Sequence, residues 1–124
     1  MLMGRELLLV VDDNDIVLSA LARVLARWPL VLAVDVAEAT VALRTRAIDL
    51  VVTDLLMPGG SGRDVLDASR RLDPKRPVVL VTGILDYVDP AICNAFDAAF
   101  AKPIDSAELV ATIGRLLARR HLDG

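Results

Sequence analysis

Short apolar runs alternate with amphipathic stretches along the whole chain. The runs at 7–11, 30–34, 50–53, 78–81 and 98–101 are rich in Leu, Val and Ala and predict buried strands. The stretches between them predict helices over 37–46 and 62–72, and three more that begin after the capping candidates Asn14 or Asp15, Asp89 and Asp105. Five strand–helix units in this order predict a single-domain α/β fold, a (βα)5 three-layer sandwich with a parallel five-stranded sheet and right-handed crossovers.

The composition fits one such domain. The chain has 124 residues, of which 55% are hydrophobic and only 3% aromatic, so Ala, Leu and Val must fill strands that are covered on both faces. The formal net charge of −3 argues against a nucleic-acid surface, and no apolar run approaches the roughly 20 residues of a membrane span. The single cysteine, Cys93, permits no internal disulfide, and we therefore expect a cytoplasmic protein.

Polar side chains follow several of the apolar runs at the point where each predicted strand ends. Asp12 and Asp13 follow the first run, Asp54 the third, Thr82 the fourth and Lys102 the fifth. The carboxyl ends of parallel strands meet at one edge of an open α/β sheet, where such folds hold their ligands. We therefore expect these side chains to converge on one pocket.

Two adjacent carboxylates with a third nearby form an oxygen-rich cluster. A hard divalent cation relieves their mutual repulsion, and Mg²⁺ prefers one or two carboxylates together with waters and phosphate oxygens. Taken singly, each residue has a plainer interpretation: Asp12 and Asp13 as helix caps, Asp54 as an Asx turn, Thr82 as a turn hydroxyl and Lys102 as a solvated lysine. Their joint occurrence at successive strand ends favours a site for Mg²⁺-assisted phosphoryl transfer.

The motifs VVDDND, VVTDLLMPGGSG, VVLVTG and AKPI occur in the order and spacing of a known family. From about residue 7 to 117, the chain resembles the receiver domain of two-component response regulators, with a chemotaxis-regulator-like fold. The resemblance implies the sheet order 2-1-3-4-5. It also implies a receiver over 1–124 with no output domain in this chain.

The resemblance further implies a role for each polar residue. Asp54 corresponds to the phosphoacceptor, Thr82 to a hydroxyl that binds a phosphoryl oxygen, and Lys102 to the ammonium that pairs with the acceptor. Within the acidic pair, Asp13 corresponds to the direct metal ligand, and Asp12 acts through water. The full Mg²⁺ site implied by the family consists of Asp12, Asp13, Asp54 and the backbone carbonyl of Leu56. A cis peptide bond between Lys102 and Pro103 is also implied.

The family supplies expectations about partners as well. It implies a phosphohistidine donor, on a histidine kinase or a histidine phosphotransfer protein, and a downstream protein target on the face of the fourth helix, fifth strand and fifth helix. We expect Arg115, Arg119 and Arg120 to project from the polar side of that last helix. A homodimer is compatible with this pattern, and we expect a protein that promotes its own phosphorylation without being a turnover enzyme.

One position departs from the family pattern. Receivers of this kind usually carry Tyr or Phe three residues before the motif lysine, where this chain has Ala99, and Phe100 occupies the next place. The ring that usually follows the threonine hydroxyl is therefore missing, and Tyr87 is a candidate to replace it. His121 lies near the C-terminus, where we expect it to be solvated.

Two other functions fit part of the sequence. A pseudo-receiver would act as a binding module without phosphorylation, although such domains typically lose part of the acidic cluster or the lysine, and this chain keeps both. A haloacid-dehalogenase-like phosphatase would explain the pattern of Asp13, Asn14 and Asp15, but it would leave the segment that follows Asp54 unexplained.

Overall fold

The computed structural model describes residues 6–123 and contains a main sheet of five short strands. These strands are β1 (Leu8–Val11), β2 (Leu30–Ala33), β3 (Leu50–Thr53), β6 (Val78–Thr82) and β7 (Ala98–Ala101). A separate two-stranded hairpin consists of β4 (Leu56–Met57) and β5 (Gly60–Ser61). The helices are α1 (Asp15–Val24), α2 (Val36–Thr45), α3 (Gly62–Leu72), the 3₁₀ turn η1 (Leu85–Tyr87), α4 (Pro90–Cys93) and α5 (Ser106–Asp123).

The main sheet is parallel throughout, with the order β2-β1-β3-β6-β7. Because the hairpin takes two of the strand numbers, this order is the 2-1-3-4-5 order that the family resemblance implied. The predicted fold class is therefore confirmed. The register aligns the strand ends, since Val11 pairs with Ala33 on one side and with Thr53 on the other.

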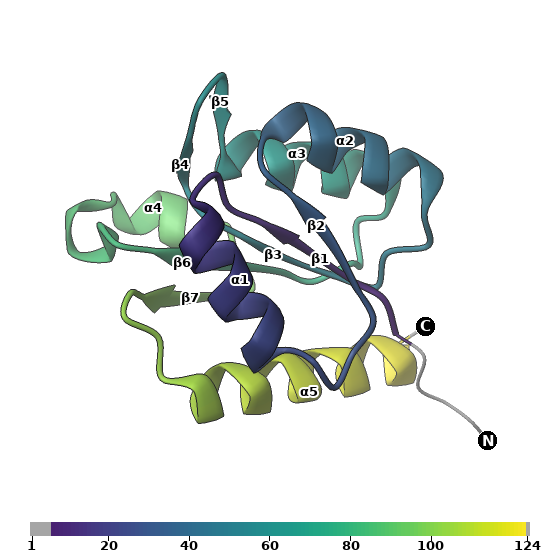
Figure 1. Cartoon of the computed structure of the whole chain (residues 1–124). Coiled ribbons are helices and arrows are strands. Elements are labelled where there is room, and N and C mark those ends of the chain that lie inside the picture. The colour runs from purple at the N-terminus through teal and green to yellow at the C-terminus, as the bar shows by residue number, and fades with distance from the viewer. Residues whose placement is uncertain (1–5, 124) are drawn as a thin grey trace.

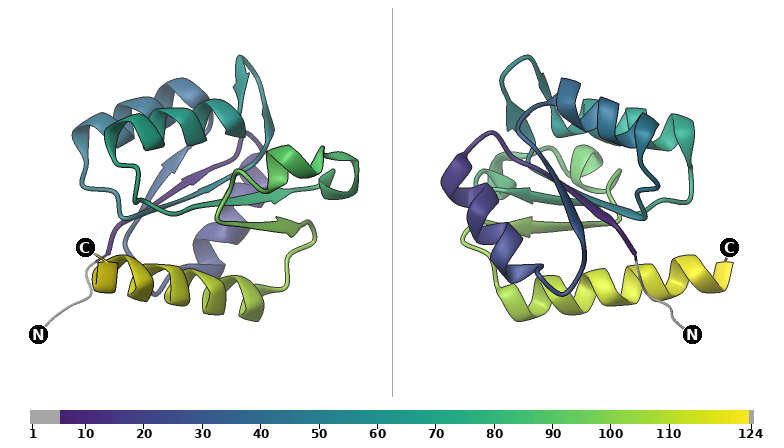
Figure 2. Two further views of the ribbon diagram at one scale, coloured as in Figure 1. Left: turned by 180° about the vertical axis from the view of Figure 1, so that it is seen from behind. Right: turned by 45° about the vertical axis from the view of Figure 1, so that its right-hand side comes forward.

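Helices cover both faces of the sheet. Figures 1 and 2 show α2 and α3 on one face and α1 and α5 on the other. Side chains alternate between these layers along each strand, so that Leu9 and Val11 face α2 and α3, while Leu8 and Val10 face α1 and α5. All four are fully buried, which explains why the strands are continuous apolar runs.

Side-chain caps start the helices at the predicted places. Asn14, one of the two candidates for α1, accepts hydrogen bonds from the N–H groups of Ile16 and Val17. Asp89 accepts from Ala91 at the start of α4, with Pro90 in the first turn. Asp105 accepts from the N–H of Glu108. In the part of the chain that the structure describes, no helix is both long and apolar enough to span a bilayer.

The opposite edge of the sheet, where the strands begin, carries a cluster of paired charges. Arg76 is 6% exposed and donates to the Ser69 hydroxyl and to a backbone carbonyl before β3, both at 3.0 Å. Arg120 donates to Asp73 at 2.7 Å and lies 3.8 Å from Asp49. This cluster ties α5 to the loops that precede β3 and β6.

Candidate phosphoryl-transfer site

Backbone hydrogen bonds bring three of the predicted site residues to the same edge of the sheet. The N–H of Asp54 donates to the carbonyl of Val11, so the residue after β3 lies beside the end of β1. The N–H of Lys102 donates in the same way to Thr82 at the end of β6. Asp12, directly after β1, is thereby placed between the neighbouring strand ends.

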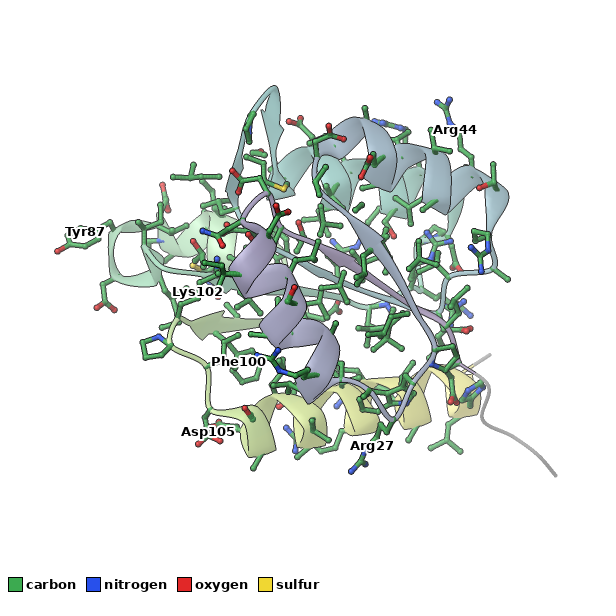
Figure 3. All side chains as sticks on the ribbon, viewed as in Figure 1. Arg27, Arg44, Tyr87, Phe100, Lys102 and Asp105 are labelled. Carbon is green, nitrogen blue, oxygen red and sulfur yellow. The ribbon has the colours of Figure 1, made fainter. Side chains whose placement is uncertain are left out.

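The ammonium of Lys102 joins two of the carboxylates. Its Nζ atom lies 2.8 Å from Asp12 Oδ2 and 3.2 Å from Asp54 Oδ2. Burial alone would lower the pKa of Lys102, but the hydrogen bond and charge of Asp12 and the charge of Asp54 outweigh it and hold that pKa above its usual value. Lys102 is therefore a fixed positive charge at neutral pH, and Figure 3 shows it near the first turn of α1.

Three carboxylates form the acidic cluster that the sequence predicted. One carboxylate oxygen from each of Asp12, Asp13 and Asp54 lies within 4.8 Å of the others. Asp12 is 1% exposed, and its second oxygen accepts from the N–H of Asn14 at 2.9 Å. Asp13 is exposed and has no hydrogen-bond or ion-pair partner within residues 6–123. With a single ammonium against three carboxylates, the cluster carries excess negative charge.

Thr82 ends β6 at this edge, but its side chain has a different partner. The residue is 1% exposed, and its hydroxyl oxygen accepts from the N–H of Ile84 at 3.4 Å. That distance is long for a hydrogen bond. No direct bond joins the Thr82 hydroxyl to Asp54 or Lys102 in the described structure.

The segment after Asp54 is more ordered than predicted. Residues 57–61 carry no predicted strand or helix, whereas Met57, Gly60 and Ser61 take part in the β4–β5 hairpin. Ser61 caps α3 in a reciprocal pair with Asp64. Gly62 is required, because a Cβ atom there would collide with the Asp54 carbonyl. The side chain of Leu56 is 59% exposed, and metal ligation by its carbonyl stays a prediction.

The segments around Ala99 contain an aromatic residue that the sequence analysis missed. Phe96, just before β7, is 6% exposed and belongs to the core cluster against which Ala99 and Ile84 pack. Phe100 packs in the other layer, and Figure 3 shows its ring between β7 and α5. Tyr87 is 89% exposed and points away from the protein. The only sequence signal for Phe96 was its place in an otherwise Ala-rich segment.

One expectation for the C-terminal helix needs correction. Arg115 and Arg119 are exposed as predicted, but Arg120 is only 20% exposed because it pairs with Asp73 and Asp49 at the far edge of the sheet. His121 is exposed, as expected, and its Nε2 atom lies 2.7 Å from a carboxylate oxygen of Glu6. Neither residue lies at the candidate site. The peptide bond between Lys102 and Pro103 is cis, as the resemblance implied.

An apolar groove adjoins the site. It has a volume of about 270 Å³ and lies between α1 and the segment that follows β7. Ile16, which is 80% exposed, and Val17 line one side, and Lys102 and Ile104 line the other. The groove is an apolar surface immediately beside the acidic cluster.

Comparison with known proteins agrees with this geometry. Residues 8–114 match the family model for the response regulator receiver domain. The chain is 37% identical over 122 residues to the response regulator protein PilR of Pseudomonas aeruginosa, an alignment that covers 92% of this chain and 27% of PilR. It is 35% identical over 121 residues to the DNA-binding response regulator MtrA of Mycolicibacterium smegmatis, covering 94% and 53%. The chain therefore spans between about a quarter and about half of these relatives.

Solved structures give the same result. The structure of the response regulator protein TrrA of Thermotoga maritima, in complex with Mg²⁺ and BeF, superposes with a TM-score of 0.82 at 26% sequence identity. The superposition covers 90% of this chain and 98% of that one. Both the sheet and its connections are thus shared over nearly the whole domain.

Proposed function

Because the chain belongs to the family of response regulator receiver domains, we propose that Asp54 accepts a phosphoryl group from a phosphohistidine donor in a Mg²⁺-dependent transfer. The position of the Asp54 carboxylate is the observation that carries this proposal. It lies beside Asp12 and Asp13 and 3.2 Å from the Lys102 ammonium. A nucleophilic carboxylate, a site for a divalent cation and a fixed positive charge are the groups that this transfer requires.

The acidic cluster has the donor set that suits Mg²⁺. Asp13 is the direct ligand in this proposal because its carboxylate is exposed and unpaired, whereas both oxygens of Asp12 already accept hydrogen bonds. Asp54 and the backbone carbonyl of Leu56 complete the protein ligands. Bound Mg²⁺ supplies positive charge that polarises phosphoryl oxygens.

Besides Mg²⁺ and the phosphohistidine donor, the transfer uses groups of this chain. An oxygen of Asp54 attacks phosphorus, the bond from phosphorus to the donor nitrogen breaks, and its electron pair leaves with the histidine ring. Lys102 lowers the repulsion between the attacking carboxylate and the dianionic phosphoryl group. We assign the Thr82 hydroxyl to a phosphoryl oxygen, because its oxygen accepts from the Ile84 N–H and its O–H can donate a charge-assisted hydrogen bond to that oxygen.

Two surfaces complete the proposal. The donor protein docks on the apolar groove beside α1, and Lys102 is one of the residues that line this groove. The donor is a histidine kinase or a histidine phosphotransfer protein. The downstream protein binds the face of α4, β7 and α5. Ile84 connects Thr82 to the cluster that holds Phe96, Val88 and Ile92. In this proposal, that cluster follows the movement of the Thr82 hydroxyl, as the aromatic ring that is missing at Ala99 usually does.

The deciding experiment is incubation with acetyl phosphate or phosphoramidate, with and without Mg²⁺, followed by mass spectrometry of the modified peptide. We expect modification at Asp54, dependence on Mg²⁺ and complete loss in Asp54→Asn. Asp67→Asn is a matched control, because Asp67 is an exposed carboxylate on α3 whose only shown ion pair is with Arg63.

Other outcomes would support a different function. A folded wild-type chain that stays unmodified in the presence of Mg²⁺ would indicate the pseudo-receiver. Modification that persists at the same rate in Asp54→Asn would contradict the assigned acceptor. Sustained turnover of p-nitrophenyl phosphate would contradict our proposal that the chain is not a turnover enzyme.

A further inference from the structure

The outer edge of β2 carries backbone N–H and C=O groups that pair with no other strand of the described chain. β2 stands at one end of the sheet order, and Figure 1 shows it as the outermost strand, in front of β1. Leu32 is 46% exposed and Val34 is 36% exposed. Residues 30–34 include no Lys, Pro or charged residue, although these are the residues that normally protect a strand edge from pairing.

The ladder between β1 and β2 determines which backbone groups face this edge. The carbonyls of Pro29 and Ala33 accept hydrogen bonds from β1, so the odd-numbered residues of this strand point towards β1. Leu30 and Leu32 therefore direct their N–H and C=O groups outwards, where no other strand of the described chain pairs with them.

The outward N–H groups on either side are already engaged. The N–H of Val34 donates to Glu38 Oε1 at 2.9 Å, and the N–H of Trp28 donates to the carbonyl of Leu25 at 3.1 Å. An added strand can consequently form a complete hydrogen-bonded pair only at Leu30 and at Leu32.

We propose that this edge binds the same edge of a second copy of the chain, in an antiparallel pairing that sets Leu30 opposite Leu32 of the second copy. Opposed residues in such a pair exchange both N–H···O bonds, and twofold symmetry repeats the pair. Other registers are poorer. Setting Leu32 opposite itself would require the N–H of Val34, and setting Leu30 opposite itself would require that of Trp28, and both are occupied.

The charges that flank β2 favour a second copy as the occupant. Arg27 precedes the strand and is exposed, with its guanidinium over the Trp28 ring, 5.5 Å from the ring centre. Asp35 and Glu38 follow the strand. In the proposed register, the basic flank of each copy lies on the same side as the acidic flank of the other. A second copy therefore supplies matching hydrogen bonds, matching apolar side chains and opposite charges together.

The test is sedimentation equilibrium of the full chain over a concentration series, without Mg²⁺ or phosphodonor, so that the result is independent of the proposed phosphorylation. We expect the mass to rise from 13.3 kDa towards twice that value. Leu32→Pro removes an outward N–H and shortens an exposed apolar side chain, while the N–H and C=O groups that bond β1 belong to the neighbouring residues. It should raise the dimer dissociation constant at least about tenfold. Leu32→Lys should do the same if the proline variant folds poorly.

A matched control and a local measurement complete the test. Leu72→Lys alters a similarly exposed leucine on α3, which is 51% exposed, and should leave dimerisation unchanged. Amide hydrogen exchange at Leu30 and Leu32 should slow as protein concentration rises. A chain that stays monomeric up to about millimolar concentration, the range of very weak association, would overturn the proposal. A dimer unaffected by both Leu32 variants would overturn it too.

Discussion

The two edges of the main sheet each hold a cluster of acidic and basic side chains, but the charges are balanced at only one of them. At the edge where strands begin, Asp49 and Asp73 face Arg76 and Arg120, so two carboxylates meet two guanidinium groups. At the edge where strands end, three carboxylates meet the single ammonium of Lys102. The balanced cluster is complete as a structural tie, whereas the other retains the capacity to bind a cation.

The basic residues also differ between the two edges, with arginines at the edge where strands begin and Lys102 at the edge where they end. Arginine offers several fixed donors, and Arg76 uses them on a hydroxyl and a carbonyl while it forms an ion pair with a carboxylate. Lysine is a compact charge on a flexible stem, and Lys102 pairs with two carboxylates at once.

Removing Arg76 should have the largest effect on stability. We expect Arg76→Met to lower the free energy of unfolding by about 3 kcal/mol, because it removes the Arg76 donor from the Ser69 hydroxyl and from a buried carbonyl and removes the ion pair with Asp73. Urea denaturation provides the measurement. Arg71→Met, at an exposed position on α3, should change it by less than about 0.5 kcal/mol. Equal losses in both variants would show that the buried cluster is not a structural tie.

Magnesium should stabilise the chain through the opposite edge alone. At about one hundred times its dissociation constant, Mg²⁺ should raise the free energy of unfolding by about 2.7 kcal/mol. Asp13→Ala should lose most of this increment and Asp12→Ala less of it, while Asp73→Ala should keep it. Thermal unfolding with and without Mg²⁺, together with calorimetric titration, measures the effect. The same increment in all variants would refute the assigned ligands.

Neutralising one carboxylate should have opposite signs at the two edges when no metal is added. Asp13→Asn should raise the free energy of unfolding by about 0.5 kcal/mol, since it relieves repulsion at an exposed position. Asp73→Asn should lower it by about 1 kcal/mol, because it weakens the bond from Arg120. Measurement of unfolding in a chelating buffer tests both variants. Asp86→Asn is an exposed control at the edge where the strands end. A loss of stability in Asp13→Asn would contradict the excess of negative charge.

Acidification should produce the smallest effect, through Asp73 at the balanced edge. The hydrogen bond from Arg120 lowers the pKa of Asp73 below its usual value of 3.8, despite the opposing effect of burial. The stability linked to this carboxyl is therefore fully present above pH 3.8 and is lost as the pH falls through the lower pKa of the folded state. Arg120→Met should reduce this acid-side loss in unfolding measurements from neutral pH downwards. An unchanged pH profile would show that Arg120 does not set the pKa.

The sequence by itself determined the elements and the chemistry they carry. Continuous apolar runs such as 78–81 favour strands covered on both faces, and cap candidates such as Asn14 and Asp89 indicate where helices begin. Since parallel strands end at one edge, the positions of Asp12, Asp54 and Lys102 followed from chain order alone. The family pattern added the strand order, because local periodicity carries no information about which strands are neighbours.

Tertiary structure decided the pairings, because they depend on distances between segments far apart in the chain. Only the folded chain shows that Lys102 lies closer to Asp12 than to Asp54, and that Arg120 turns back to Asp73 when helical periodicity placed it with the exposed arginines. The β4–β5 hairpin and the burial of Phe96 likewise arise from packing against neighbouring elements. Local propensity states which surface a residue can cover, and the fold determines which partner it meets there.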